Sequence, residues 1–304
     1  MFRKQLNCIA FAALSLFQIS FGDACNCWKT KENGLVFTNY KTLDFRSLAK
    51  YAGPVPPIIN GYNANAQAKA TSAYFKSSAW TKFFSLQTWG DTGSPVKMIN
   101  SPNNAYIQKN TDGSTYLTLR TYRTKSFQSV VEADSVADDY TAASLRILSR
   151  VHGSPGACAG AFTYKSDDHT GVQHESDIEV LTQNSKNIIH YTTHPESENH
   201  DFDGTFSIAA KDSSGWNKWQ EHRLDWTQPH STWYLNGKQN GQLSHELAQV
   251  PSYLILNMWS RGDSDWEGTM AVGGSAYYDV QYIQVAYNTS TESSRACTST
   301  CTLP

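Results

Sequence analysis

The sequence predicts an all-β protein, built as an antiparallel sandwich of two sheets over roughly residues 70–290. Short runs rich in β-branched and aromatic residues recur from Trp80 onward with turn residues between them, a spacing typical of a sandwich or barrel. After the first 22 residues, no stretch of about 12 residues keeps a helical periodicity. The 304 residues, 39% of them hydrophobic, suffice for one large core.

The expected strands follow one another as short apolar runs. In chain order they are Phe83 to Trp89, Ala105 to Gln108, Tyr116 to Tyr122, Ser144 to Arg150, Gly160 to Tyr164, Glu175 to Leu181, Asn187 to Thr193, Gln220 to Trp226, Ser231 to Leu235, Tyr253 to Trp259 and Ala276 to Ala286. Asp112-Gly113 and Asn236-Gly237 stand between such runs and favour tight hairpins.

The N-terminus has the layout of a signal peptide over residues 1–22. Basic Arg3 and Lys4 precede an apolar run from Ile9 to Phe21 that is too short for a permanent membrane span. The C-terminal residues 295–304 lack the hydrophobic tail of a lipid-anchor signal. We therefore expect a secreted protein, extracellular or in a cell wall, with no membrane anchor.

The charge distribution excludes two classes of partner. The net charge is −2, and Lys and Arg do not cluster into the basic surface that nucleic acid or an anionic membrane requires. We also expect the protein to be a monomer.

The high aromatic content, 12% of the residues, fits either an aromatic-rich core or a surface that stacks on sugar rings.

Five cysteines remain after the expected signal peptide, and four of them lie near the chain ends. Cys25 and Cys27 stand near the mature N-terminus and Cys297 and Cys301 near the C-terminus, so disulfides could join the two ends of an exported chain. Their pairing stays open, and a zinc site is the less favoured alternative. Cys158 would then be a buried free thiol.

Three carboxylates alternate along one expected strand. Glu175, Asp177 and Glu179 are two residues apart, which places them on one face of the strand. Their backbone span is about 13 Å, and side chains leaning together over a concave strand can approach the roughly 5 Å between the carboxyls of a retaining glycosidase. Acids this close cannot all ionise easily, so at least one pKa should rise.

A solvated acidic strand face is the alternative interpretation of this pattern. Such a face usually mixes charge signs, because neighbouring like charges repel each other. Between Arg150 and Lys186, however, Lys165 is the only Lys or Arg. This imbalance favours a catalytic role for the three acids.

The Glu-x-Asp-x-Glu pattern resembles the signature of glycoside hydrolase family 16, whose fold is a concanavalin A-like jelly roll. Other segments resemble the family in the same order: Gly156 to Phe162, Trp219 to Thr227, Trp233 to Gly237, Pro251 to Ser260, Trp266 to Gly268 and Tyr278 to Tyr287. Cys25-Asn26-Cys27-Trp28 resembles fungal members. The absence of an extra residue between Asp177 and Glu179 resembles the regular-strand branch, which holds lichenases and transglycosylases.

The resemblance implies roles for the acids. Glu175 would be the nucleophile, Asp177 the assisting residue and Glu179 the general acid and base. No cofactor or metal is expected. The loop His194 to Gly204 is acidic, but it lacks a familiar metal-ligand spacing and is interpreted as a solvated cleft edge.

Six residues are candidate substrate contacts. By resemblance or by residue type they are Trp89, Tyr164, His174, His190, Trp259 and Trp266. Trp226 and Trp233 are assigned to packing. Ser176, Gln173 and Thr193 depart from the usual family residues beside the cleft, so the polymer specificity stays open.

The resemblance also suggests a domain organisation and an activity. Beyond the signal peptide we expect an N-terminal extension (23–69) packed on the catalytic domain (70–290), then a cysteine-containing tail (291–304). The expected activity is a retaining endo-β-glycosidase on β-1,3- or β-1,3-1,4-glucan. The alternatives are a cell-wall transglycosylase, a hydrolase of galactan or xyloglucan, and a carbohydrate-binding lectin. Asn288-Thr289-Ser290 is a candidate glycosylation site.

Overall fold

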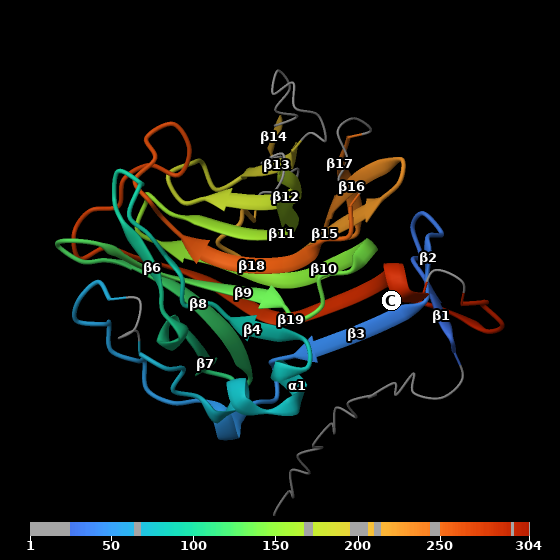
Figure 1. Ribbon diagram of the computed structural model, residues 1–304, viewed down its shortest axis with the longest axis horizontal. Coiled ribbons are helices and arrows are strands. Elements are labelled where there is room, and N and C mark those ends of the chain that lie inside the picture. The colour runs from blue at the N-terminus through green and yellow to red at the C-terminus, as the bar shows by residue number, and fades with distance from the viewer. Residues whose placement is uncertain are drawn as a thin grey trace, which may run out of the picture.

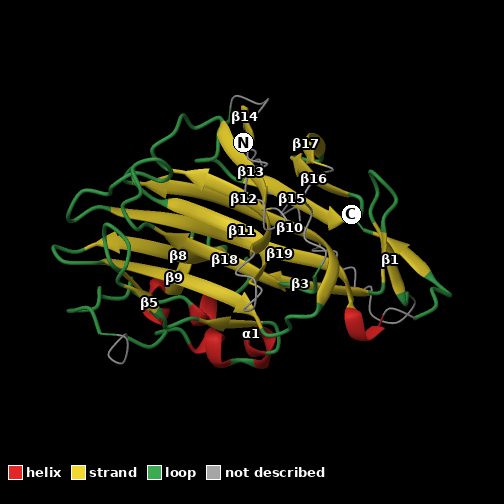
Figure 2. Ribbon diagram, turned by 45° about the horizontal axis from the view of Figure 1, so that its top comes forward, coloured by secondary structure: helices red, strands yellow, loops and turns green. Residues whose placement is uncertain are grey.

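The computed structural model describes residues 25–63, 68–166, 173–194, 206–209, 214–243, 250–292 and 295–303. The expected signal peptide lies outside these residues. Strands make up nearly all the regular structure, with short helices outside the sheets (Figure 2). Two largely antiparallel sheets form a curved sandwich (Figure 1), which confirms the predicted fold class.

One sheet, called the front sheet here, carries the acidic strand. Its order is β4 (Phe84–Leu86), β9 (Gln128–Ser135), β18 (Tyr253–Trp259), β11 (Cys158–Ser166), β12 (Gln173–Leu181), β13 (Ile188–His194) and β14 (Phe206–Ala209). All these pairs are antiparallel.

The opposite sheet, called the back sheet, is built around the long strand β19. Its order is β7 (Ala105–Lys109), β8 (Thr115–Arg123), β19 (Ser275–Thr289), β10 (Tyr140–Gly153), β15 (Gln220–Thr227), β16 (His230–Leu235) and β17 (Lys238–Leu243). Strand β9 connects the two sheets, because its first residues also pair with β8. The short strands β5 (Gly90–Asp91) and β6 (Met98–Asn100) lie beside it, with β6 parallel to β9.

The helices of the described residues are single turns outside the sandwich. They are α1 (Ser78–Thr81) and the 3-10 turns Ala49–Tyr51, Ala73–Lys76, Pro102–Asn104 and Ser290–Glu292. In the part of the chain that the structure describes, no helix is both long enough and apolar enough to cross a bilayer.

The core fills the space between the sheets because alternate residues of each strand point inward. On β12, Ile178 and Val180 are buried in this core while the acids take the other face. Trp226 and Trp233 are both buried, which confirms their assignment to packing. Trp233 stacks on Tyr191 at 5.2 Å between ring centroids, and its Nε1 donates to the backbone oxygen of Asp177 at 2.8 Å. The back sheet thereby supports the acidic strand.

Several strands were missing from the sequence prediction. Strand β9 has only the short apolar pair Val130-Val131 before acids alternate with small residues. Strand β17 is mostly polar, and β3 (Asn39–Asp44) buries only Leu43, yet β3 pairs with the second half of β19. The expected N-terminal extension thus contributes a strand to the back sheet.

The predicted Asn236-Gly237 hairpin is confirmed, since both residues have positive φ values of 51° and 74°.

The chain ends form a small separate sheet held by two disulfides. Strands β1 (Cys27–Lys29), β2 (Val36–Phe37) and β20 (Thr300–Thr302) make this sheet, and β1 runs parallel to β20. The disulfides are Cys25–Cys301 and Cys27–Cys297. Cys158 is the free cysteine of the described residues and is buried. The predicted cross-link of the two ends is confirmed, and the structure supplies the pairing.

Candidate active site

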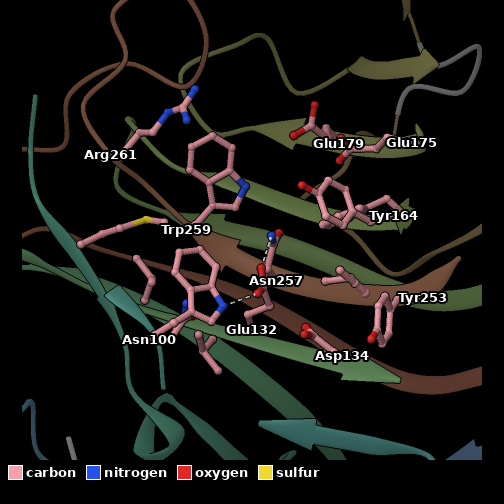
Figure 3. Close-up of a pocket in the computed structure, with 16 residues that line it drawn as sticks. Asn100, Glu132, Asp134, Tyr164, Glu175, Glu179, Tyr253, Asn257, Trp259 and Arg261 are labelled. Carbon is pink, nitrogen blue, oxygen red and sulfur yellow. Dashed lines mark hydrogen bonds between the residues drawn. The ribbon is translucent and has the colours of Figure 1, made fainter. Parts of the chain in front are cut away.

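The three predicted acids share one face of β12, as their spacing requires. The opposite face carries Ser176, whose Oγ lies 3.0 Å from the Oγ of Ser231 on the back sheet. The acids therefore point away from the core. In Figure 3, Glu175 and Glu179 project from β12 on the same side of the front sheet.

A cavity of about 520 Å³ lies against this face of the front sheet. Glu175 and Glu179 both line it, and strands β9, β11 and β18 supply much of the rest. Its other lining residues are Trp89, Met98, Asn100, Val130, Val131, Glu132, Asp134, Phe162, Tyr164, Tyr253, Ile255, Asn257, Trp259 and Arg261. The cavity combines aromatic rings with hydrogen-bonding groups, as sites for sugars require.

Burial raises the pKa of all three acids on β12. Asp177 is 2% exposed, and burial together with the charges of Glu175 and Glu179 raises its pKa well above the usual value. Burial also raises the pKa of Glu175, while a hydrogen bond with Asp177 acts in the opposite direction. A hydrogen bond donated by protonated Asp177 favours the carboxylate form of Glu175 and so opposes the burial that raises the pKa of Glu175 to about 8. The carboxylate is the state that a nucleophile needs.

Glu179 has a different set of neighbours. Burial raises its pKa, and a hydrogen bond from the thiol of Cys158 at 3.1 Å lowers it, as does one with Trp266. The charge of Glu267 raises it further, and Arg261 lowers it. A carboxyl with a raised pKa can hold a proton near neutral pH, as a general acid must.

Three of the predicted substrate contacts line the cavity. Trp89 is 44% exposed, and its Nε1 donates to Oε1 of Glu132 at 2.9 Å. Tyr164 is the strand neighbour of Glu175. The guanidinium of Arg261 lies 5.5 Å from the ring centroid of Trp259. Trp89, Tyr164 and Trp259 all line the cavity, and Figure 3 shows Tyr164 and Trp259 on opposite sides of it.

His190 and Trp266 gather beside Glu179. His190 on β13 is the strand partner of Glu179, and its ring lies 4.9 Å from that of Trp266. Its Nε2 is 2.7 Å from Nδ2 of Asn184. Burial lowers the pKa of His190, which favours the neutral ring. Both residues thus lie beside Glu179, at one end of the acidic strand face.

His174 requires a correction. It lies an odd number of residues from Glu175, Asp177 and Glu179, so strand alternation turns its side chain to the opposite face of β12. It is 6% exposed and is not part of the cavity lining. The alternation removes His174 from the substrate contacts.

Two cavity acids on β9 were not predicted. Glu132 accepts hydrogen bonds from Trp89 and, at 3.2 Å, from Nδ2 of Asn257, and burial raises its pKa. Burial and the charge of Glu132 raise the pKa of Asp134 to about 7. The i, i+2 spacing of the two acids after Val130-Val131 repeats the pattern on β12. That spacing was the available signal for a second acidic strand.

Gly160 lies opposite Glu179 on β11, and its lack of a side chain makes room for Asn257. A Cβ at Gly160 would lie 2.6 Å from Oδ1 of Asn257. We expect Gly160→Ala to displace the Asn257 amide from Glu132 and to lower kcat/KM about tenfold, the scale of one lost hydrogen bond to a charged group. Steady-state kinetics on a soluble polysaccharide substrate measure this.

The matched control is Gly53→Ala, because nothing lies within 4 Å of a Cβ at Gly53. That variant should keep both kcat/KM and the thermal unfolding midpoint. Unchanged kcat/KM in Gly160→Ala would mean that the Asn257 position does not matter for turnover.

Comparisons with known proteins agree with this geometry. The family model "Glycosyl hydrolases family 16" matches residues 93–283. No curated protein sequence matches the chain. Among solved structures, a β-1,3-1,4-glucanase (lichenase) from a mouse hindgut metagenome superposes with a TM-score of 0.56 at 16% identity, covering 69% of this chain and 94% of the other.

Two further structures are similar. A family 16 endo-glucanase from Bacteroides ovatus, solved with the ligand G4G3G-2F-DNP, has a TM-score of 0.56 at 13% identity and covers 67% of this chain and 95% of the other. An endo-β-1,3-glucanase from Pyrococcus furiosus has a TM-score of 0.54 at 15% identity and covers 69% and 90%. At these identities the likeness shows the shared fold.

Proposed function

Because this chain belongs to glycoside hydrolase family 16, we propose that it is a retaining endo-β-glycosidase acting on a β-1,3- or β-1,3-1,4-glucan. The observation that carries the proposal is the placement of Glu175 and Glu179 on one strand face, lining one cavity, with Asp177 between them. We also propose that the chain is exported, which its two disulfides support.

The proposed reaction is a double displacement. The carboxylate of Glu175 attacks the anomeric carbon, and Glu179 donates its proton to the departing glycosidic oxygen. Glu179 then removes a proton from the incoming water, which attacks the same carbon and releases Glu175. Asp177 keeps its proton and donates a hydrogen bond to Glu175, which favours the carboxylate before attack and after release.

The substrate class rests on the cavity and on the relatives. Trp89 and Trp259 offer flat apolar faces for sugar rings, and acids and amides between them can bind hydroxyl groups. Two of the similar solved structures are described as a β-1,3-1,4-glucanase and an endo-β-1,3-glucanase. Strand β12 pairs with β11 without a bulge from Glu175 to Glu179, which supports the regular-strand branch.

The test is a product analysis of the purified protein. We incubate it with β-1,3-glucan, β-1,3-1,4-glucan, xyloglucan and galactan, and follow reducing ends, chain lengths and the anomer formed first by proton NMR. We expect internal cleavage of a β-glucan with β-anomers formed first, because two displacements restore the configuration. Initial α-anomers, or no turnover of any polymer, would refute the proposal. Redistributed chain lengths without new reducing ends would identify a transglycosylase.

A further inference from the structure

The thiol of Cys158 is directed at the carboxyl group of Glu179. Its Sγ donates to Oε1 of Glu179 at 3.1 Å, and Cys158 is completely buried. The direct strand partner of Glu179 is Gly160, while Cys158 stands two residues away on the same face of β11.

We propose that Cys158 is a positioning residue that fixes the Glu179 carboxyl and stabilises its ionised form, acting through Glu179 and not on the substrate. The inference rests on the proposed function, in which Glu179 is the general acid and base. Neither the disulfides nor the substrate cavity requires a cysteine at this place, since Cys158 is free and is not part of the cavity lining.

The chemical state of the thiol fits this role. Burial raises the pKa of Cys158 well above its usual value, and the charge of Glu179 raises it further, so the group stays an S–H donor. A donor hydrogen bond to the carboxylate favours the charged form of Glu179 and opposes the effect of burial. The thiol therefore limits how far the pKa of the proposed acid rises.

The other groups around Glu179 act in both directions. Charged, titratable or hydrogen-bonding neighbours come from its own strand, from β13 and from the loop after β18: Glu175, Asp177, His190, Arg261, Trp266 and Glu267. Glu267 is completely buried, and its Oε1 accepts hydrogen bonds from the backbone of Arg261 and Asp263 at 2.8 and 3.1 Å. We expect this carboxyl to stay in place when Cys158 is changed. Loss of the thiol then removes one of the interactions that lower the pKa of Glu179, while burial and the charge of Glu267 still raise it.

The first test is the pH profile of kcat/KM for Cys158→Ala and Cys158→Ser. The general acid must be protonated, so its pKa sets the alkaline limb. In Cys158→Ala this limb should move to higher pH by about half a unit to one unit, the range expected for one lost weak donor. Cys158→Ser keeps a donor and should retain the wild-type limb or move it to lower pH. An unmoved limb in the alanine variant, or the same upward shift in both variants, would overturn the inference.

The second test does not depend on activity. The S–H stretching band of Cys158 is identified in Raman difference spectra as the band that Cys158→Ser lacks. At a pH above the alkaline limb, where wild-type Glu179 is a carboxylate, this band should move to higher frequency in Glu179→Gln, because a neutral amide oxygen accepts more weakly than a carboxylate. An unmoved band would overturn the inference even if Cys158→Ala failed to fold. If the band moves but Glu179→Gln keeps full activity, the proposed function fails and the contact stands.

Discussion

Replacement of Glu175 by glutamine should lower kcat/KM on β-glucan by about 10⁴-fold or more, the scale seen when other covalent enzymes lose their nucleophile. The amide keeps the size of the side chain but cannot form the glycosyl-enzyme bond. The fold should survive, because an uncharged amide removes a buried carboxylate from an acidic group of three. Kinetics on the best polymer and the thermal unfolding midpoint measure the two effects.

The control and a chemical rescue separate catalysis from structure. Glu292→Gln makes the same charge change on a side chain that is 43% exposed, in the turn Ser290–Glu292, and should leave kcat/KM unchanged. With an aryl β-glycoside, Glu175→Ala plus azide should give the α-glycosyl azide, because azide attacks from the side that Glu175 occupied. Activity within tenfold of wild type in Glu175→Gln would rule out this residue as the nucleophile.

Replacement of Glu179 by glutamine should lower kcat/KM on the polymer by about 10²- to 10⁴-fold, the usual contribution of general acid–base catalysis. The loss should be much smaller for the first step on an aryl glycoside with an acidic phenol, since that leaving group departs without a proton. Parallel kinetics on the two substrates measure this difference. Azide with Glu179→Ala should give the β-glycosyl azide, through the covalent intermediate on Glu175.

The stereochemistry distinguishes the two roles in one pair of experiments. An α-azide from Glu175→Ala and a β-azide from Glu179→Ala agree with the proposed assignment. The reverse pattern would make Glu179 the nucleophile and Glu175 the general acid. Equal losses on polymer and aryl glycoside in Glu179→Gln would indicate that this side chain does not protonate the leaving group.

The acidic strand was readable from the sequence because side-chain alternation is a local property of a strand. The spacing of Glu175, Asp177 and Glu179 alone fixes one shared face, and the structure has that face lining the cavity. The same rule turns His174 away, so this error was avoidable: one residue of offset changes the face. The cross-link between the two ends of the chain was also predictable from the sequence, because both ends carry cysteines.

Other features of the site depend on which strands become neighbours. Strand β9 pairs with β18, more than a hundred residues further along the chain, and brings Glu132 beside Asn257. The i, i+2 spacing of its acids could mark an acidic strand, but nothing in the sequence shows that this strand lies beside β18.

The sequence by itself determined the sandwich, the shared face of the three acids and the presence of cysteines at both ends, because each follows from residue spacing or composition. Only the tertiary structure decided the disulfide pairing, the β9 acids facing the cavity and the thiol of Cys158 against Glu179. The physical reason is that strand register between distant segments is set by the packing of the whole core, which no local pattern contains. Glu179 shows both contributions: its strand face follows from the sequence, and the neighbours that shift its pKa follow from the fold.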